Sequence, residues 1–186
     1  RGFSHSLFVL APVSFLIWLA VLGLWQPARA APGRWLAVIG LALVTHPLLD
    51  AHTAYGTQLF WPIPVSPTSW STLFIIDPLY TLPLIVGVIV AALRRHARAA
   101  PAVLAICLSI STVYMGWSWV ARGLVAHEAK AAMLRAGLVD APIFLTPTPF
   151  NTLLWRVVIL TGDGHLEGLD SVVIDEGPMQ LSFFPS

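Results

Sequence analysis

Residues 7–25 of this chain read LFVLAPVSFLIWLAVLGLW and contain no charged side chain. A helix needs about 20 largely apolar residues to cross the hydrocarbon core of a bilayer. The run has this length and stops at Gln26-Pro27, where proline disfavours a continuing helix. The stretch therefore predicts a membrane-spanning helix, and it sets the expectation for the rest of the chain.

Three further apolar runs follow the first, at Trp35–Leu49, Leu73–Leu93 and Pro101–Ala121. The second ends at His46 and Asp50, and the third is interrupted by Asp77. We therefore expect a mainly α, polytopic membrane protein with about four transmembrane helices.

The composition agrees with a lipid environment. Of 186 residues, 57% are hydrophobic and only 10% are charged, whereas soluble domains carry about 25% charged residues. So few charges cannot cover the surface of a soluble domain of this size. The composition excludes an ordinary soluble enzyme, a disordered chain and a basic nucleic-acid-binding domain, so we expect no nucleic-acid partner.

The last third has a different pattern. The helical pattern of the fourth run continues to Ala136 and stops at Gly137, a residue typical of helix C-termini. After a proline-rich connector at 142–149, strands are predicted at 153–160 and 165–174, separated by a Gly-Asp-Gly turn. We expect a transmembrane domain at 1–136 and a small β-rich extramembrane piece at 137–186, which could be no more than this hairpin.

Basic residues in short loops predict the orientation in the membrane. Arg29 and Arg34 lie between the first two runs, and Arg94, Arg95 and Arg98 lie between the last two. The loop at 51–72 has no Lys or Arg. Both basic loops are therefore expected on the cytoplasmic side, with the 51–72 loop and the C-terminal third on the outer side.

Ionisable residues next to membrane spans are candidates for function, because burying them in lipid costs free energy. Segments distant in sequence bring His5, His46, Asp50, His52 and Asp77 to the same outer face. His46 and Asp50 are four residues apart and share one face of a helix. Imidazole and carboxylate groups suit zinc or another divalent first-row metal.

Each of these residues also has a structural interpretation. His46 and Asp50 could form a hydrogen-bonded pair, and Asp77 before Pro78 has the pattern of a helix N-cap. His5 could be an interfacial polar residue and His52 a loop histidine. The 51–72 loop is rich in aromatic residues and proline, which suits either the headgroup layer or an ordinary packed loop.

Several blocks resemble a known family. Residues 1–6, RGFSHS, are similar to the R-G-[FIL]-[ST]-H-S motif of the YdjM-like inner-membrane proteins, described as metal-dependent hydrolases. The family's H-x-x-x-D, Y-G and L-x-W-P pattern is matched by three segments of this chain, His46 to Asp50, Tyr55-Gly56 and Leu59–Pro62. Residues 74–83, FIIDPLYTLP, match its F-I-x-D-P-L-Y block, and 147–156 resembles a block after the last span. Members usually carry a further histidine motif upstream, and since the chain starts at Arg1 we expect a preceding segment.

The resemblance implies a divalent-metal hydrolase of the bacterial inner membrane, with zinc as the expected ion. Its ligands would be His5, His46, Asp50 and Asp77, on the periplasmic face of a multi-pass protein. By analogy with zinc-dependent phospholipases C, the expected substrate is a phosphoester, which could be a membrane lipid or lipid-linked. We expect His52 as the proton acceptor or a further ligand, and expect substrate-binding residues at Tyr55, Asn151 and Arg156.

A rival interpretation is a non-catalytic membrane subunit or scaffold, in which the same polar residues tie helix ends together. A transporter is less favoured, because transport sites lie near the bilayer midplane and these residues lie at span ends.

Overall fold

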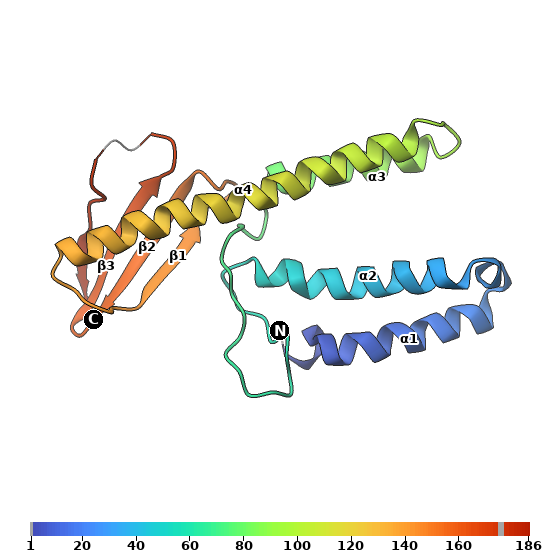
Figure 1. Ribbon diagram of the computed structural model, residues 1–186, viewed down its shortest axis with the longest axis horizontal. Helices are drawn as coiled ribbons and strands as arrows, with labels where there is room; N and C mark the ends of the chain where they lie inside the picture. Colours follow the sequence, from blue (N-terminus) through green and yellow to red (C-terminus); the bar gives the residue numbers. More distant parts are fainter. Residues whose placement is uncertain (1, 175–176) are drawn as a thin grey trace. The chain divides into compact units, whose positions relative to one another are not determined.

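The computed structural model describes residues 2–174 and 177–186, so that Arg1 of the RGFSHS motif lies outside the described residues. The chain divides into two compact units, Arg1–Trp70 and Ser71–Ser186. The first contains a pair of helices, and the second contains another pair of helices and a β-sheet (Figure 1). The predicted domain boundary at residue 136 lies inside the second unit and stays a prediction.

The first unit is an antiparallel helical hairpin (Figure 1). Its elements are α1 (Leu7–Leu24), the 3-10 turn η2 (Gln26–Ala30) and α2 (Pro32–Ala51). At the turn, the guanidinium of Arg29 donates hydrogen bonds to the carbonyls of Leu22 and Gly23, at 2.7 and 3.2 Å. The last carbonyls of a helix have no partner within the helix. Arg29 therefore supplies donors that the apolar end of α1 lacks.

The opposite end of the hairpin is closed by the segment after α2. The short 3-10 helix η1 (Phe3–His5) precedes α1. The backbone N–H of Leu7 donates to the carbonyl of Leu59 at 2.9 Å, and Trp70 N–H donates to the carbonyl of Ala51 at 2.7 Å. The loop after α2 is thus attached both to the start of α1 and to the end of α2.

The second unit begins with another helical hairpin, formed by α3 (Pro78–Leu93) and α4 (Ala100–Arg135). The two helices approach closely at Gly87, where a Cβ atom would lie 2.9 Å from the Cβ of Cys107. Small residues permit such close packing between apolar helices. The hydroxyl of Ser111 also donates to the carbonyl of Tyr80 at 2.8 Å.

Within the described residues, three helices, α1, α2 and α4, are long and apolar enough to cross a membrane. The expected count of about four spans is not confirmed, because α3 has only 16 residues. At 1.5 Å per residue α3 is about 24 Å long, shorter than a hydrocarbon core of about 30 Å. Asp77 caps this helix and Pro78 is its first residue, as the Asp-Pro pattern indicates, so the apolar residues 73–76 lie before the helix.

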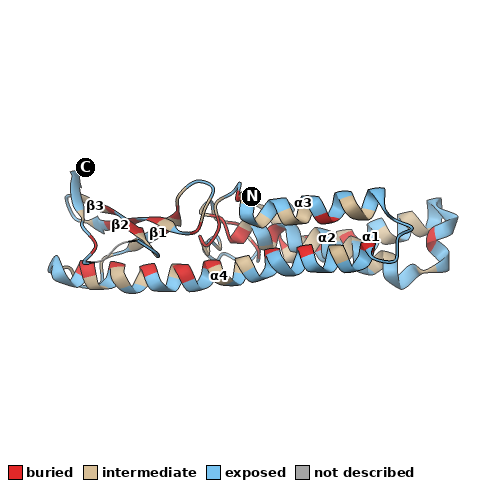
Figure 2. Ribbon diagram, turned by 90° about the horizontal axis from the view of Figure 1, so that it is seen from above, coloured by how far each residue is buried: buried red, intermediate tan, exposed pale blue. Residues whose placement is uncertain are grey.

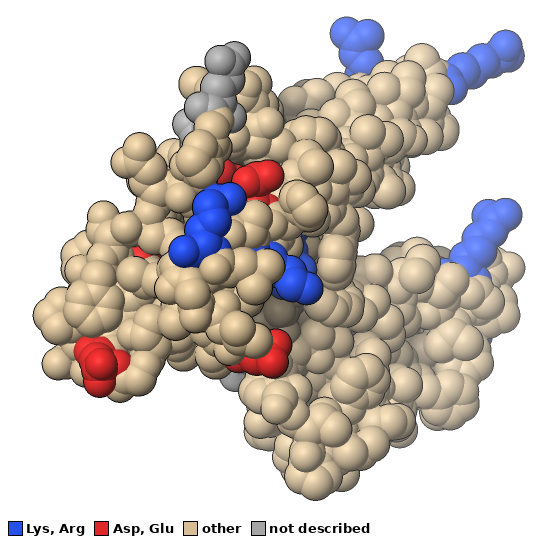
Figure 3. All heavy atoms as spheres, turned by 60° about the vertical axis from the view of Figure 1, so that its left-hand side comes forward, with Lys and Arg blue, Asp and Glu red and all other residues tan. Residues whose placement is uncertain are grey.

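The surface of these helices is largely apolar. Figure 2 shows exposed and intermediate residues along most of their length, and α1 buries only Leu10 and Ser14. On the face drawn in Figure 3, basic side chains project at the tip of each hairpin, while the helix surfaces behind the tips are uncharged. Large apolar surfaces of this kind are stable in lipid and not in water.

The C-terminal half of α4 has a different environment. Its residues Ala121, Val125, Ala129 and Met133 recur at helical spacing and are buried against the sheet. The helix ends at Arg135 and is followed by Gly137, whose φ of +72° is unfavourable for other residues. Leu138 N–H donates to the carbonyl of Met133 and Gly137 N–H to that of Leu134, which is the Schellman arrangement.

The sheet has four antiparallel strands in the order β1-β2-β3-β4. The strands are β1 (Ile143–Pro147), β2 (Leu154–Thr161), β3 (Gly164–Ser171) and β4 (Ser182–Pro185). Alternate residues of β2, Trp155, Val157 and Ile159, are fully buried and form the core with α4. The predicted hairpin is therefore present as β2 and β3, and two further strands extend it into a sheet.

Candidate metal centre

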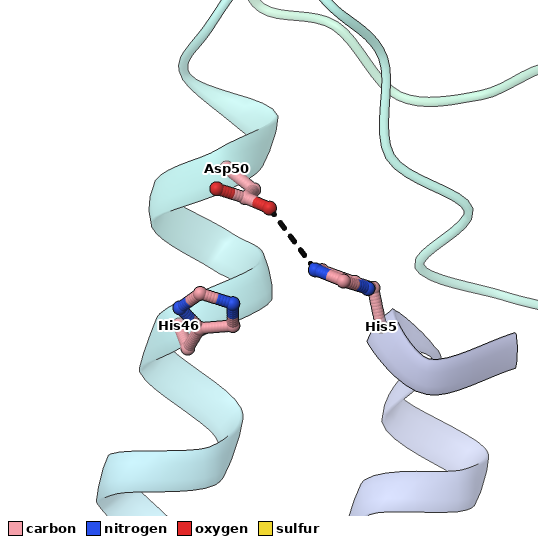
Figure 4. Close-up of side chains that lie close together, drawn as sticks. All are labelled: His5, His46 and Asp50. Atoms are coloured by element: carbon pink, nitrogen blue, oxygen red, sulfur yellow. Dashed lines mark ion pairs between the residues drawn. The ribbon is translucent and has the colours of Figure 1, made fainter. Parts of the chain in front are cut away.

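Three ionisable side chains meet at the loop end of the α1–α2 hairpin. Ligand atoms of His5, His46 and Asp50 lie within 4.8 Å of one another. His5 Nε2 lies 3.2 Å from a carboxylate oxygen of Asp50, and the two imidazole rings are 5.3 Å apart between centroids. Figure 4 shows His5 reaching from the turn before α1 toward two residues on α2.

The local sequence explains this geometry. His46 and Asp50 are four residues apart in α2, so both side chains lie on one face of that helix. His5 is the last residue of η1, whose backbone is fixed by the hydrogen bond from His5 N–H to the carbonyl of Gly2 at 3.0 Å. The short turn thus directs an imidazole across to the face of α2 that carries the other two groups.

Hydrogen bonds orient the ring of His5. Its Nδ1 lies 3.0 Å from the hydroxyl of Ser4, and its Nε2 faces Asp50. An ionised carboxylate only accepts hydrogen bonds, so Nε2 carries a proton when it pairs with Asp50. Nδ1 then accepts from Ser4. A cation in the cluster would replace the Nε2 proton, since metal ligands must be deprotonated.

The donor set fits a divalent cation. Two imidazoles and one carboxylate are a ligand set of catalytic zinc sites, which keep a further position for water or substrate. His5 and Asp50 are partly buried, and His46 is exposed. The cluster therefore offers three converging donors and an accessible side.

His52, the predicted proton acceptor, lies just after α2 and is not a member of this cluster. Its Nδ1 lies 2.9 Å from the carbonyl of Leu48, and its ring packs edge-on against Trp70 at 4.7 Å. Because a carbonyl only accepts, Nδ1 is the protonated nitrogen. Burial lowers the pKa of His52, with a smaller opposing effect from the Leu48 hydrogen bond. The imidazole is therefore held in its neutral form, with its basic nitrogen at Nε2.

Asp77, the predicted fourth ligand, belongs to the second unit and is almost fully buried there. One carboxylate oxygen accepts from the backbone N–H groups of Leu79 and Tyr80, at 3.0 and 3.4 Å. The other accepts from the hydroxyl of Tyr114 at 2.9 Å, and Thr152 donates to Tyr114 at 3.1 Å. Asp77 is thus an N-cap, which was the alternative interpretation of its sequence pattern.

Two of the predicted substrate-binding residues, Asn151 and Arg156, contact protein groups. The side-chain oxygen of Asn151 accepts from Leu153 and Leu154 N–H, both at 2.9 Å, and organises the turn before β2. Arg156 forms two hydrogen bonds of 2.7 Å with the carboxylate of Glu167 on β3. Substrate binding by either residue stays a prediction.

Tyr55 is the third predicted substrate-binding residue. It lies in the first unit and is 68% exposed. It lines an open hollow of about 440 Å³ together with Gly2, Gly56, Gln58 and Pro67. Gly2 is also the residue whose carbonyl fixes the turn that carries His5. The hollow therefore shares Gly2 with the turn that carries His5, and its described lining carries no charge.

Sequence reasoning did not single out Ser4, Tyr114 and Thr152. Tyr114 carries a phenol inside an apolar run, and a buried phenol requires a hydrogen-bond partner. From this requirement alone, a polar partner for the hydroxyl of Tyr114 could have been expected, and that partner is Asp77. The partners themselves, at positions 77 and 152, are set by tertiary structure.

Among the described residues, three helices are long enough to span a membrane, and their surfaces are largely apolar. These features define an integral membrane protein. The sequence profile of the YdjM inner membrane protein family matches residues 1–125, and the chain belongs to this family. The matched range includes the whole His5, His46 and Asp50 cluster and ends within α4, before the sheet. No curated protein and no solved structure gives a significant match to the chain.

Proposed function

We propose that this protein is a multi-pass inner-membrane hydrolase that binds a divalent cation, zinc by preference, through His5, His46 and Asp50 and cleaves a phosphoester. The observation that carries the proposal is the convergence of three donor groups within 4.8 Å. A bound divalent cation lowers the pKa of a coordinated water toward about 7 and stabilises developing negative charge.

The chain's own residues have separate tasks in this proposal. Ser4 orients the ring of His5, in the way that outer partners orient ligating histidines in metal sites. The neutral imidazole of His52 serves as the proton acceptor at Nε2. Tyr55 binds the organic part of the substrate. The carboxylate of Asp77 accepts hydrogen bonds at the start of α3. The proposed site therefore uses three ligands, all from the first unit.

The proposed topology follows from the charges at the hairpin tips. Arg29 lies at the tip of the α1–α2 hairpin, and Arg94, Arg95 and Arg98 follow α3. Basic residues in short loops favour the cytoplasm. The candidate metal centre is at the opposite end of the α1–α2 hairpin and is therefore proposed to face the periplasm. The proposed substrate is a phosphoester reached from that side, such as that of a membrane lipid.

Metal analysis of the purified protein in detergent tests the proposal. After chelation and reloading with zinc, the wild type should retain one zinc ion per chain. His46→Ala and Asp50→Ala should lower zinc affinity by more than the roughly 10–100-fold that loss of an outer partner costs. His96→Ala and Asp163→Ala are matched controls, because both side chains are exposed and lie outside the cluster. Equal zinc content in wild type and in the His46 and Asp50 variants would refute the metal site.

A second candidate function is a non-catalytic scaffold. The contact between His5 and Asp50 at 3.2 Å favours it, because that pair ties the turn before α1 to α2 without needing a metal ion. Under this hypothesis Asp50→Asn lowers the thermal unfolding temperature but changes neither zinc content nor hydrolysis of a chromogenic phosphodiester. Under the hydrolase proposal the same variant loses both zinc and zinc-dependent hydrolysis.

A further inference from the structure

The loop that closes the first unit exposes a largely apolar segment without charged residues. Residues 60–67, with the sequence FWPIPVSP, are all exposed, and Ser66 is their only polar side chain. Ile63 and Val65 are each 50% exposed, although Ile and Val are among the residues most often buried. Runs of exposed apolar residues are rare in water and usually mark a contact surface.

The backbone of this segment is adapted to surroundings poor in water. Pro62, Pro64 and Pro67 have no N–H group. The N–H groups of Ile63 and Val65 donate to carbonyls of the same loop, at 2.9 and 2.8 Å. An unpaired backbone donor is costly where water is scarce. Prolines and internal hydrogen bonds reduce that cost for the segment.

The segment is also continuous with a candidate membrane span. The hydroxyl of Ser6, directly before α1, donates to the carbonyl of Trp61 at 2.6 Å, and Phe3 packs edge-on against the ring of Trp61. Residues 51–70 include no Asp, Glu, Lys or Arg. The apolar surface of α1 therefore extends onto the loop without an intervening charge.

From these observations we propose that residues 60–67 insert into the interfacial layer of the lipid bilayer at the end of α1. Aromatic residues favour this depth, and an irregular backbone is excluded from the hydrocarbon centre but not from the interface. The inserted segment is attached to the turn that carries His5. It therefore holds the His5, His46 and Asp50 cluster at the level of the lipid headgroups, whether or not a metal binds there.

Spin-label accessibility in the full-length protein tests this proposal. Cys107 is replaced by alanine, a single cysteine is introduced by Ile63→Cys, and the labelled protein is placed in phosphatidylcholine–phosphatidylglycerol vesicles. Collision rates are measured with oxygen, which partitions into lipid, and with a water-soluble nickel complex. Leu16→Cys in the middle of α1 is the lipid reference, and Asp163→Cys in the β2–β3 turn is the water reference. Val65→Cys repeats the measurement if the first variant does not fold.

We expect the oxygen-to-nickel ratio at residue 63 to exceed that at residue 163 several-fold and to lie below that at residue 16. A ratio equal to that at residue 163 would overturn the proposal, because the loop would then be in water. Low accessibility to both reagents would also overturn it, since a second copy or another protein would then cover the segment.

Discussion

Helix α4 contains two halves whose apolar side chains occupy different surroundings. In the first half, Ile106, Ile110 and Val113 are exposed, whereas in the second half Val125 and Met133 are buried beneath the β-sheet. Apolar side chains are stable when water is removed from them, whichever material replaces it. Lipid is the expected cover for the first half, and the sheet covers the second.

The difference shows how one helix can extend out of a membrane. At 36 residues, α4 is about 54 Å long, which exceeds a hydrocarbon core of about 30 Å. Its apolar face continues beyond the span and requires a protein partner there. The strands supply that partner, and the ion pair between Arg156 and Glu167 lies on the other face of the sheet.

Among the substitutions that test this comparison, Trp155→Ala should cause the largest loss of stability. Trp155 is fully buried between β2 and α4, so its loss should lower the free energy of unfolding by about 3–5 kcal/mol. The measurement is chemical unfolding in detergent. Trp119→Ala is the matched control, because Trp119 lies in α4 and is exposed, and its effect should be much smaller. Equal effects of the two substitutions would contradict a core formed between the sheet and the buried face of α4.

A matched pair of valines in α4 gives a smaller effect. Val125 is fully buried, whereas Val113 is 72% exposed. Val125→Ala should lower the free energy of unfolding by about 1.5–3 kcal/mol, the value of a buried aliphatic side chain. Val113→Ala should leave it nearly unchanged in detergent. Thermal unfolding of both variants checks the pair, and a reversed order would mean that the first half of α4 is packed against protein.

The smallest expected effect is the pH dependence of the Arg156–Glu167 pair. The hydrogen bonds from Arg156 hold the pKa of Glu167 below its usual value. A lowered pKa in the folded state stabilises the protein above the unfolded pKa of about 4.3, and the stabilisation is lost as pH falls through the folded pKa. Wild type should therefore be more stable than Glu167→Gln at pH 7, and the difference should shrink below pH 4. Unfolding curves at pH 7 and pH 3.5 measure it, and a constant difference would contradict the assignment.

Much of the helical architecture could be predicted from local sequence. The apolar run at 7–25 corresponds to α1, and the pattern ending at Gly137 corresponds to the end of α4. The start of α3 was indicated by Asp77-Pro78, the pattern of an N-cap followed by a first-turn proline, although the apolar run itself begins earlier, at residue 73. Hydropathy averages over a window, whereas a cap is a single side chain.

The sheet was only partly predictable because strand pairing is not local. β1 lies within a segment whose prolines favour an extended chain without showing that it pairs with β2. At the candidate centre, the spacing of His46 and Asp50 already predicted a shared helix face. The partner of Arg156 was not predictable, because Glu167 is brought to it only by the pairing of β2 with β3.

The chain of hydrogen bonds from Thr152 through Tyr114 to Asp77 joins three parts of the second unit: the connector before β2, the middle of α4 and the first turn of α3. Opening any one of these contacts removes a hydrogen-bond partner from a partly buried polar group, which costs free energy. The sheet and the α3–α4 hairpin should consequently gain and lose structure as one cooperative block. Amide exchange in β2 and in the first turn of α3 is then governed by a shared opening event.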